Sequence, residues 1–316
     1  DVLICVRGCE YPTLRIVQAA KASGRFLIYF LDDDLLNIPS GNASTNYYRD
    51  NKIKVNLTRI VGLCDVLWAV NQQILFQYGK FIPRSILLRV PAKIWRQPPE
   101  ASEQIHILYA GSADHSGLAR ELLVPVIQRL LKEYAGRVDF TFIGADPGLR
   151  NTAGVTTHPY FESYDEYQKQ VQAGDFSIGL APAYDTPFYA CKYYNKFIEY
   201  SSYGIAGIYS DCEPYRQIVT QEKNGLLCEN TAEGWYQAIK CLLEGSGAAR
   251  EMALAGAELL REQFNYQAVA QSLKEQLPEV VSFQAVPIME NEVSLPPMKL
   301  LFYQEFLEEK EKFLFL

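Results

Sequence analysis

The chain has 316 residues, of which 48% are hydrophobic, so it is long enough for two domains of ordinary size, each with its own core. Its 30 basic and 37 acidic side chains give a net charge of −7, which argues against a nucleic acid or another polyanion as a partner. No apolar run approaches the ~20 residues of a transmembrane helix and no signal peptide is evident, so the sequence predicts a cytoplasmic protein that is soluble or at most membrane-associated.

The first part of the chain alternates short apolar runs with helical patterns, which predicts βα units and a parallel sheet. The expected strands cover residues 1–6, 26–31, 65–70 and 85–90, and the expected helices cover residues 12–23, 50–63 and 71–79. Paired prolines and polar residues in WRQPPEASEQ indicate a linker. We therefore expect an N-terminal Rossmann-like domain at residues 1–95 and a linker at residues 96–104. The start at Asp1, inside a strand-like run, leaves open that an upstream piece of this domain is missing.

A second βα series is predicted over residues 105–277. Its expected strands cover residues 106–111, 138–144, 154–158, 176–182, 207–210 and 225–229. Its expected helices lie near 117–134, 163–173, 213–220, 231–244 and 247–263, and a further helix carries Lys192 and Lys196. The fold class is therefore α/β, with two Rossmann-like, doubly wound domains whose strands open onto a common cleft.

Residues 278–316 end in MKLLFYQEFLEEKEKFLFL, which mixes Leu and Phe with Glu and Lys at helical spacing. We expect this tail to contain a helix that packs back on the first domain. A helix that makes a peripheral contact with a membrane, or that binds a partner, is the alternative.

Cysteine and histidine are too scattered to predict a disulfide framework or a metal site. Most of the cysteines lie inside apolar runs and none forms a CxxC pair, so we expect reduced, buried thiols. The cysteines are Cys5, Cys9, Cys64, Cys191, Cys212, Cys228 and Cys241, and the histidines are His106, His115 and His158.

One helical stripe carries two lysines and a carboxylate where a cleft is expected. On a helix, Lys192, Lys196 and Glu199 fall within about 60° of one another, with Tyr203 on the same line. The stripe is either a surface ladder of ion pairs or a site at which the lysines neutralise a diphosphate. In a site of that kind, the carboxylate accepts hydrogen bonds from a ribose diol.

Gly111 and Ser112 end a predicted strand and precede a predicted helix. This arrangement brings backbone N–H groups and a helix dipole toward a ligand above the sheet, and a phosphate is the natural occupant. The same arrangement occurs in every βα domain, so the structural explanation stays open. Neither GxGxxG nor GxxxxGK[ST] is present.

The segment KFIEYSSYGIAGIYSDCEPYRQIVTQEKNGLLCENTAEGWYQAIKCLLE resembles the donor-binding half of GT-B glycosyltransferases. In that family a Lys-x-x-Glu-Tyr-x-x-x-Gly run leads to a strand, a Pro-Tyr turn, an Asn-Gly-Leu-Leu turn and a helix with Trp. Upstream, ILYAGSADHSGLARELLVPVIQRLLKE and VDFTFIG are similar to the first βα elements of that domain. DVLICVRG, IYFLDDDLLNIP and CDVLWAVNQQILFQYGKF resemble its bacterial branch, so the resemblance extends over residues 1 to 265.

The resemblance implies specific contacts with a nucleotide-diphosphate sugar. Glu199 would bind the ribose, Gly111 and Ser112 would approach the diphosphate, and Lys192 and Lys196 would add positive charge.

Two further implications concern the base and the transferred sugar. The region after Gly144 and the turn that contains Tyr160, Phe161 and Glu162 would border the nucleobase. Many retaining GT-B enzymes have a second Glu eight residues before the ribose-binding one, and here that position is Cys191. The resemblance therefore does not decide between a retaining and an inverting reaction.

The run LDDDLL at residues 31–36 offers carboxylates in the first domain. Asp32 and Asp34 form a DxD, the pattern by which GT-A glycosyltransferases hold a divalent metal, but a second doubly wound domain argues against that family. Asp33 or Asp34 can instead bind acceptor hydroxyls, act as a general base, or cap a turn. Arg7 and Arg89 end strands at the same edge, either to reach an anion or to form structural ion pairs.

We therefore predict a glycosyltransferase that moves a sugar from a UDP- or GDP-type donor to a carbohydrate or lipid-linked acceptor, without a metal or another cofactor. The predicted catalytic residues are Asp33, Asp34 and Lys192. Three alternatives stay open: a silent module that binds a nucleotide or a partner, a sugar-nucleotide 2-epimerase that uses His115, and a metal-dependent DxD transferase.

Overall fold

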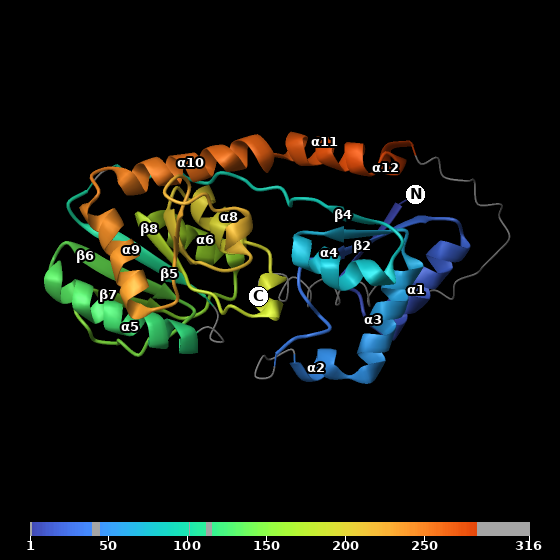
Figure 1. Cartoon of the computed structure of the whole chain (residues 1–316), viewed down its shortest axis with the longest axis horizontal. Coiled ribbons are helices and arrows are strands. Elements are labelled where there is room, and N and C mark those ends of the chain that lie inside the picture. The colour runs from blue at the N-terminus through green and yellow to red at the C-terminus, as the bar shows by residue number, and fades with distance from the viewer. Residues whose placement is uncertain (1, 40–44, 101, 112–115, 283–316) are drawn as a thin grey trace.

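The computed structural model describes residues 2–39, 45–100, 102–111 and 116–282, which form two α/β lobes side by side (Figure 1). In the first lobe, residues 2–87, four parallel strands follow one another across the sheet in chain order. The strands are β1 (Val2–Val6), β2 (Phe26–Leu31), β3 (Val66–Ala69) and β4 (Ser85–Leu87). The helices are α1 (Tyr11–Ala22), α2 (Thr45–Arg49), α3 (Asn51–Leu63) and α4 (Gln72–Tyr78), which continues into a 3₁₀ turn at Gly79–Phe81.

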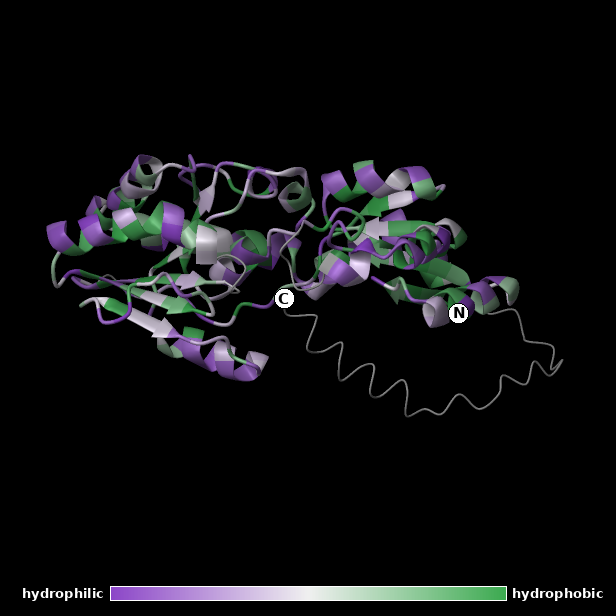
Figure 2. Ribbon diagram, turned by 90° about the horizontal axis from the view of Figure 1, so that it is seen from below, coloured by the Kyte–Doolittle hydropathy of each residue, from purple (hydrophilic) through white to green (hydrophobic). Residues whose placement is uncertain are grey.

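The strands and helices of the first lobe confirm the predicted ones, with shorter third and fourth strands and with the short helix α2 as an unpredicted addition. Side-chain caps fix two of the helix starts: Asp50 accepts a hydrogen bond from the Lys52 amide (2.8 Å), and Asn71 accepts one from the Ile74 amide (2.9 Å). Amphipathic α1 and α3 each bury one apolar side, which comprises Leu14 and Val17 on α1 and Leu57, Ile60 and Val61 on α3. Figure 2 shows helices of both lobes with hydrophobic and hydrophilic residues on different sides.

The second lobe, residues 105–263, has a six-stranded parallel sheet in the order β10-β9-β8-β5-β6-β7. The strands are β5 (Ile105–Ala110), β6 (Val138–Ile143), β7 (Val155–His158), β8 (Ile178–Ala181), β9 (Ala206–Ser210) and β10 (Leu226–Cys228). The helices are α5 (Ser116–Glu133), α6 (Tyr164–Ala173), α7 (Pro187–Ala190), α8 (Asn195–Ser202), α9 (Ala232–Glu244) and α10 (Ala248–Gln263). After β5, the chain adds β6 and β7 on one side of it, and then adds β8, β9 and β10 on the other side. Neighbouring β5 and β8 therefore form the switch point at which doubly wound sheets bind ligands.

Two details of the second lobe correct the sequence predictions. The helix expected near residues 213–220 is only a 3₁₀ turn at Tyr215–Gln217, because Pro214 and the local hydrogen bonds favour a tight turn. Cys241 is exposed on α9, whereas the other six cysteines are buried as expected. The apolar residues of α9 that face the sheet do not include Cys241, so helical periodicity places its thiol on the outer side.

Two segments connect the lobes. Residues 88–100 cross to the second lobe without a helix or strand, and the amide of Trp95 donates to the carbonyl of Ser202 (2.8 Å). The return path runs from α10 into α11 (Tyr266–Gln276) and α12 (Glu279–Ser282). In Figure 1, α10 lies above the second lobe, and α11 and α12 continue from it above the first lobe.

The return path packs on the first lobe. Val269 and Leu277 join an apolar cluster with first-lobe residues such as Val66, and Arg84 pairs with Glu279. The helix predicted in the tail beyond residue 282 lies outside the described residues. Within the described ranges, no helix combines the length and apolarity that crossing a membrane requires.

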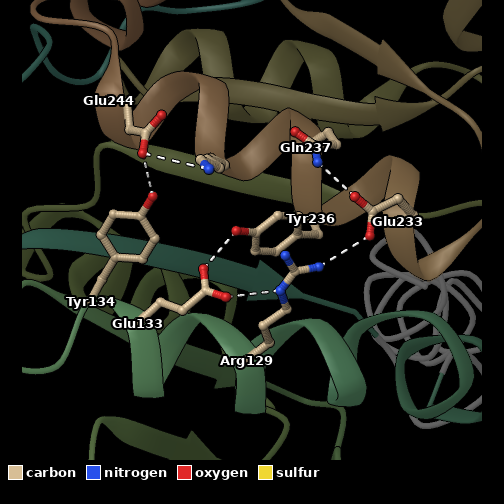
Figure 3. Close-up of polar contacts among 8 residues, drawn as sticks. Arg129, Glu133, Tyr134, Glu233, Tyr236, Gln237 and Glu244 are labelled. Carbon is tan, nitrogen blue, oxygen red and sulfur yellow. Dashed lines mark hydrogen bonds and ion pairs between the residues drawn. The ribbon is translucent and has the colours of Figure 1, made fainter.

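An exposed polar network joins α5 and α9 on the outer side of the second lobe (Figure 3). Glu133 is its centre, since it accepts hydrogen bonds from Arg129 Nε (2.9 Å) and the Tyr236 hydroxyl (2.6 Å). The guanidinium of Arg129 also lies 3.4 Å from the centre of the Tyr236 ring. We refer to Arg129, Glu133, Tyr134, Glu233, Tyr236 and Glu244 as the outer network.

Candidate functional site

The carboxyl ends of β5 and β8 bring together most of the residues predicted to bind a nucleotide. Gly111 follows β5, and the loop after β8 leads through α7 to Lys192. A Cβ added to Gly117, in the first turn of α5, would lie 3.7 Å from the Tyr184 hydroxyl in that loop. The amino end of α5 therefore lies beside the β8 loop, and its dipole favours an anion there.

Gly111 and Gly144 lie against each other at the ends of β5 and β6. Gly144 has φ +81°, and a Cβ there would lie 2.4 Å from the Gly111 carbonyl oxygen and 3.3 Å from the Tyr160 ring. Position 144 therefore requires glycine for both its backbone conformation and its close contact. Ser112, predicted beside Gly111, lies outside the described residues.

Glu199 is held by two residues of the second lobe. The Tyr167 hydroxyl donates to one carboxylate oxygen, and Lys196 Nζ donates to the other at 2.7 Å. Burial, together with the charge of Glu199, raises the pKa of Tyr167 well above its ordinary value, so this hydroxyl stays a donor. The carboxylate keeps further lone pairs for a ligand diol, and its side chain is 16% exposed.

The turn predicted to border the nucleobase is continuous with this carboxylate. The ring of Phe161 lies 6.5 Å from that of Tyr167, whose hydroxyl bonds Glu199. Tyr160 is 48% exposed and lies beside Gly144. The predicted residues Tyr160 and Phe161 thus lie at one end of a row of contacts that reaches Glu199.

The structure corrects the prediction that Lys192 shares a helix with Lys196 and Glu199. Helix α7 ends at Ala190 and α8 begins at Asn195, so Lys192 lies in the connection between them. Only Lys196 and Glu199 form a helical i,i+3 pair. A side chain of this connection contacts the segment that leaves the first lobe: Tyr193 is 7% exposed, and its hydroxyl accepts a hydrogen bond from the Val90 amide at 3.2 Å.

Lys192 meets the first lobe through Asp33. Its Nζ lies 3.1 Å from Asp33 Oδ2 and 4.7 Å from the centre of the Phe188 ring. Asp33 follows β2 and Lys192 follows β8, so the carboxyl ends of the two sheets face each other at this ion pair. Two of the three predicted catalytic residues are therefore in contact, although they are 159 residues apart in the sequence.

The three aspartates of LDDDLL have different surroundings. Asp34 is 1% exposed and accepts hydrogen bonds from the Tyr78 hydroxyl and the Asn37 side chain, both at 2.8 Å. A buried carboxylate with these partners supports the loop, so we do not retain Asp34 as a candidate base. Asp32 forms an ion pair with Arg7.

Arg7 and Arg89 have structural partners of their own. Burial by itself would lower the pKa of Arg7, but the hydrogen bond and the charge of Asp32 raise it above its usual value. Arg89 lies over the Phe264 ring at 5.4 Å. These contacts favour the structural explanation for both arginines. Among the residues with defined positions, no group of three His, Cys, Asp or Glu side chains is arranged to hold a metal ion, and His115 is not among those residues.

Sequence reasoning missed two residues that shape this site. Tyr167 gave no signal, because a tyrosine on an amphipathic helix such as α6 is ordinarily a packing residue. Asn71 gave a local signal only: an asparagine ahead of QQILFQY predicts a helix N-cap. Its side chain also donates to the carbonyls of Ala190 and Lys192 in the second lobe.

No protein-family model matches the sequence, and no curated protein does so either. Solved structures do match. TarM has a TM-score of 0.65 at 12% identity, with 87% of this chain and 54% of TarM covered. Sucrose-phosphate synthase from Thermosynechococcus elongatus has a TM-score of 0.64 at 16% identity, with 90% and 74% covered. HepE from Anabaena, solved with UDP and glucose, has a TM-score of 0.61 at 12% identity, with 88% and 77% covered.

The two facing lobes and these similarities define the fold of the chain. The chain has the GT-B fold of glycosyltransferases, with two Rossmann-like domains. It spans about half the length of TarM and about three quarters of the other two proteins.

Proposed function

We propose that this chain is a glycosyltransferase that takes a sugar from a nucleotide-diphosphate donor of the UDP or GDP type. The observation that carries the proposal is the gathering of an i,i+3 Lys196–Glu199 pair, Lys192 and the Gly111–Gly144 contact at the carboxyl end of the second sheet. In a GT-B fold this is the edge at which a nucleotide can reach both lobes. The solved structure of HepE, which contains UDP and glucose, supports the choice of donor.

Each group has a physical role in this proposal. Glu199, fixed by Tyr167 and Lys196, accepts hydrogen bonds from the ribose diol. Lys192 and Lys196, with the amino end of α5, stabilise the negative charge that grows on the diphosphate as the bond to the anomeric carbon breaks. Because protein cations supply this charge, the reaction needs no metal ion. Asp32 and Asp34 also have protein partners already.

The first lobe presents the acceptor, which we propose to be a carbohydrate or a lipid-linked glycan. The new bond joins the anomeric carbon to an acceptor oxygen, and that oxygen must lose a proton. Asp33 is 17% exposed and lies at the edge of the first lobe that faces Lys192, so it is our candidate to bind the hydroxyl and accept the proton. Donor entry would transfer Lys192 from Asp33 to the diphosphate and release the carboxylate for this role.

The test starts with binding and proceeds to turnover. Calorimetric titration with UDP and GDP should show saturable binding of at least one of them. A panel of UDP- and GDP-sugars should then show hydrolysis or transfer that survives EDTA. Failure of both diphosphates to bind would refute the proposal, and loss of turnover in EDTA would refute metal independence and favour the DxD alternative.

A second candidate is a module that binds the nucleotide without transferring a sugar. It is favoured by the ion pair of Lys192 with Asp33, which already neutralises the lysine, and by the burial of Cys191 at 1% exposure. Binding of UDP or GDP without hydrolysis or transfer of any sugar in the panel would support this candidate.

A further inference from the structure

Asn71 is a fully buried polar residue at the contact between the lobes. It follows β3 and caps α4, where its Oδ1 accepts a hydrogen bond from the Ile74 amide at 2.9 Å. Its Nδ2 donates to the carbonyl of Ala190 at 3.2 Å and to that of Lys192 at 2.7 Å. The cap uses the oxygen, so the nitrogen must face the two carbonyls, and both of its protons are used.

The two carbonyls are those that a continuous helix would use internally. In an α-helix the carbonyl of Ala190 would accept from the amide of residue 194, and that of Lys192 from residue 196. Asn71 takes the place of both donors, so α7 can end and α8 can start afresh without leaving these acceptors unsatisfied. The break that places Lys192 away from the stripe is thus stabilised by one side chain of the other lobe.

Two neighbouring contacts point the same way. The amide of Val90, which leaves the first lobe, donates to the Tyr193 hydroxyl at 3.2 Å. The side chain of Lys192 reaches Asp33 at 3.1 Å. The first lobe and the segment that leaves it therefore contact the Lys192 carbonyl, the hydroxyl of the next residue, Tyr193, and the Lys192 Nζ.

We propose that Asn71 is a positioning residue for Lys192, through which the first lobe sets where the second lobe presents its diphosphate-binding cation. The part that concerns the diphosphate rests on the proposed function, whereas the clamp on the backbone of residues 190–192 does not. The prediction is that binding of the nucleotide sugar by the second lobe depends on the side-chain amide of Asn71, whose two N–H groups are both bonded to protein carbonyls.

The test of the clamp uses Asn71→Ser, which retains an oxygen to cap α4 and removes both amide N–H donors. Asn224→Ser is the matched control, because Asn224 is 7% exposed and makes the same kinds of bond, to Thr220 and Ile218 within one turn of the second lobe. The readout is alkylation by iodoacetamide at pH 8, resolved by peptide mass spectrometry. Cys191 lies between the clamped carbonyls at 1% exposure, and its burial raises the pKa of the thiol to about 12, so it should react slowly in the wild type.

We expect Asn71→Ser to speed alkylation of Cys191 by about tenfold or more, as for a lost pair of buried hydrogen bonds. Exposed Cys241 serves as the fast reference and buried Cys64 as the control for general unfolding, and neither rate should change. Asn224→Ser should leave Cys191 slow. An unchanged rate at Cys191 in Asn71→Ser would overturn the clamp, as would an equal rise at Cys64.

The link to Lys192 is tested by a double-mutant cycle in UDP affinity. Asn71→Ser should weaken UDP binding by about tenfold in the wild-type background and by less than about twofold in a Lys192→Ala background. An equal loss in both backgrounds would show that Asn71 does not act through Lys192. If the wild type binds neither UDP nor GDP, the proposed function fails, and the alkylation experiment decides the role of Asn71 by itself.

Discussion

Two clusters of polar and charged side chains in this molecule differ in their surroundings: one lies between the lobes, and the other lies on the outer side of one lobe. The seam between the lobes consists of Asp33, Asn71 and Lys192, with exposed fractions of 17% for the Asp33 side chain, 0% for Asn71 and 30% for the Lys192 side chain. The outer network of Figure 3 joins two helices of one lobe, and its Arg129 side chain is 46% exposed.

The difference lies in what replaces a lost contact. In the outer network, the charged side chains are exposed to water and each carboxylate lies beside several donors, so ion pairs of this kind contribute little individually. In the seam, Asn71 is the buried donor to two carbonyls, and Lys192 lies at the carboxyl end of a strand where a ligand can replace Asp33. Seam substitutions should therefore alter ligand binding and turnover, and substitutions in the outer network should alter only stability.

Asp33→Asn should have the largest effect on turnover. Loss of the proton acceptor should lower sugar transfer by about a hundredfold or more, as for other general bases. Affinity for UDP should not fall, because the substitution removes the carboxylate that competes for Lys192. Steady-state transfer rates and UDP titrations measure the two effects. A transfer rate within tenfold of the wild type would show that Asp33 is only an ion-pair partner of Lys192. The seam would then not differ from the outer network in its effect on turnover.

Lys192→Ala should have the next largest effect, on nucleotide affinity. Removal of a charge-assisted contact to the diphosphate should weaken UDP binding by about tenfold. Lys240→Ala is the matched control, since Lys240 pairs with Glu244 (3.8 Å) and carries the same charge on the outer side of α9. Equal losses in both variants would indicate a general effect of net charge and would contradict a role specific to the seam.

Gly204→Ala should destabilise the protein, although it changes no charged side chain. Gly204 has φ +67°, and a Cβ there would lie 2.4 Å from the backbone nitrogen of Pro98 in the segment between the lobes. The strained conformation and the clash together should cost more than about 1 kcal/mol and lower the thermal midpoint by several degrees. Gly136→Ala isolates the strain, because Gly136 has φ +74° with nothing within 4 Å. An equal loss in both variants would show that the contact with Pro98 is unimportant.

The parts that the sequence predicted are those fixed by local periodicity. Apolar runs such as FLIYFL define buried strands of a parallel sheet, and their alternation with helical patterns predicted the strands of both sheets and most of the longer helices, but not α2, α7, α11 or α12. The spacing of Lys196 and Glu199 likewise predicted an i,i+3 pair, which is confirmed.

The parts that the sequence missed depend on contacts between residues far apart in the chain. The helical pattern is interrupted at Lys192, where the side-chain amide of Asn71, 121 residues away, donates to the Lys192 carbonyl. Asp33 and Asp34 look equivalent in LDDDLL, yet the Tyr78 hydroxyl makes Asp34 a buried acceptor. Local spacing cannot report partners that only the packing of two lobes brings together.

The smallest effect is expected from Glu133→Gln in the outer network. Hydrogen bonds from Tyr236 and Arg129 lower the pKa of Glu133 below its ordinary value of 4.5, so its contribution to stability is present above that pH and is lost as the pH falls through the lowered value. The variant should melt about 1 °C below the wild type at pH 7, and the difference should shrink as the pH falls below 4.5 and through the lowered pKa. Its UDP affinity should equal that of the wild type at every pH. A melting difference that persists in acid would mean that the carboxylate contributes through packing, and a change in UDP affinity would mean that the outer network and the seam are coupled through the second sheet.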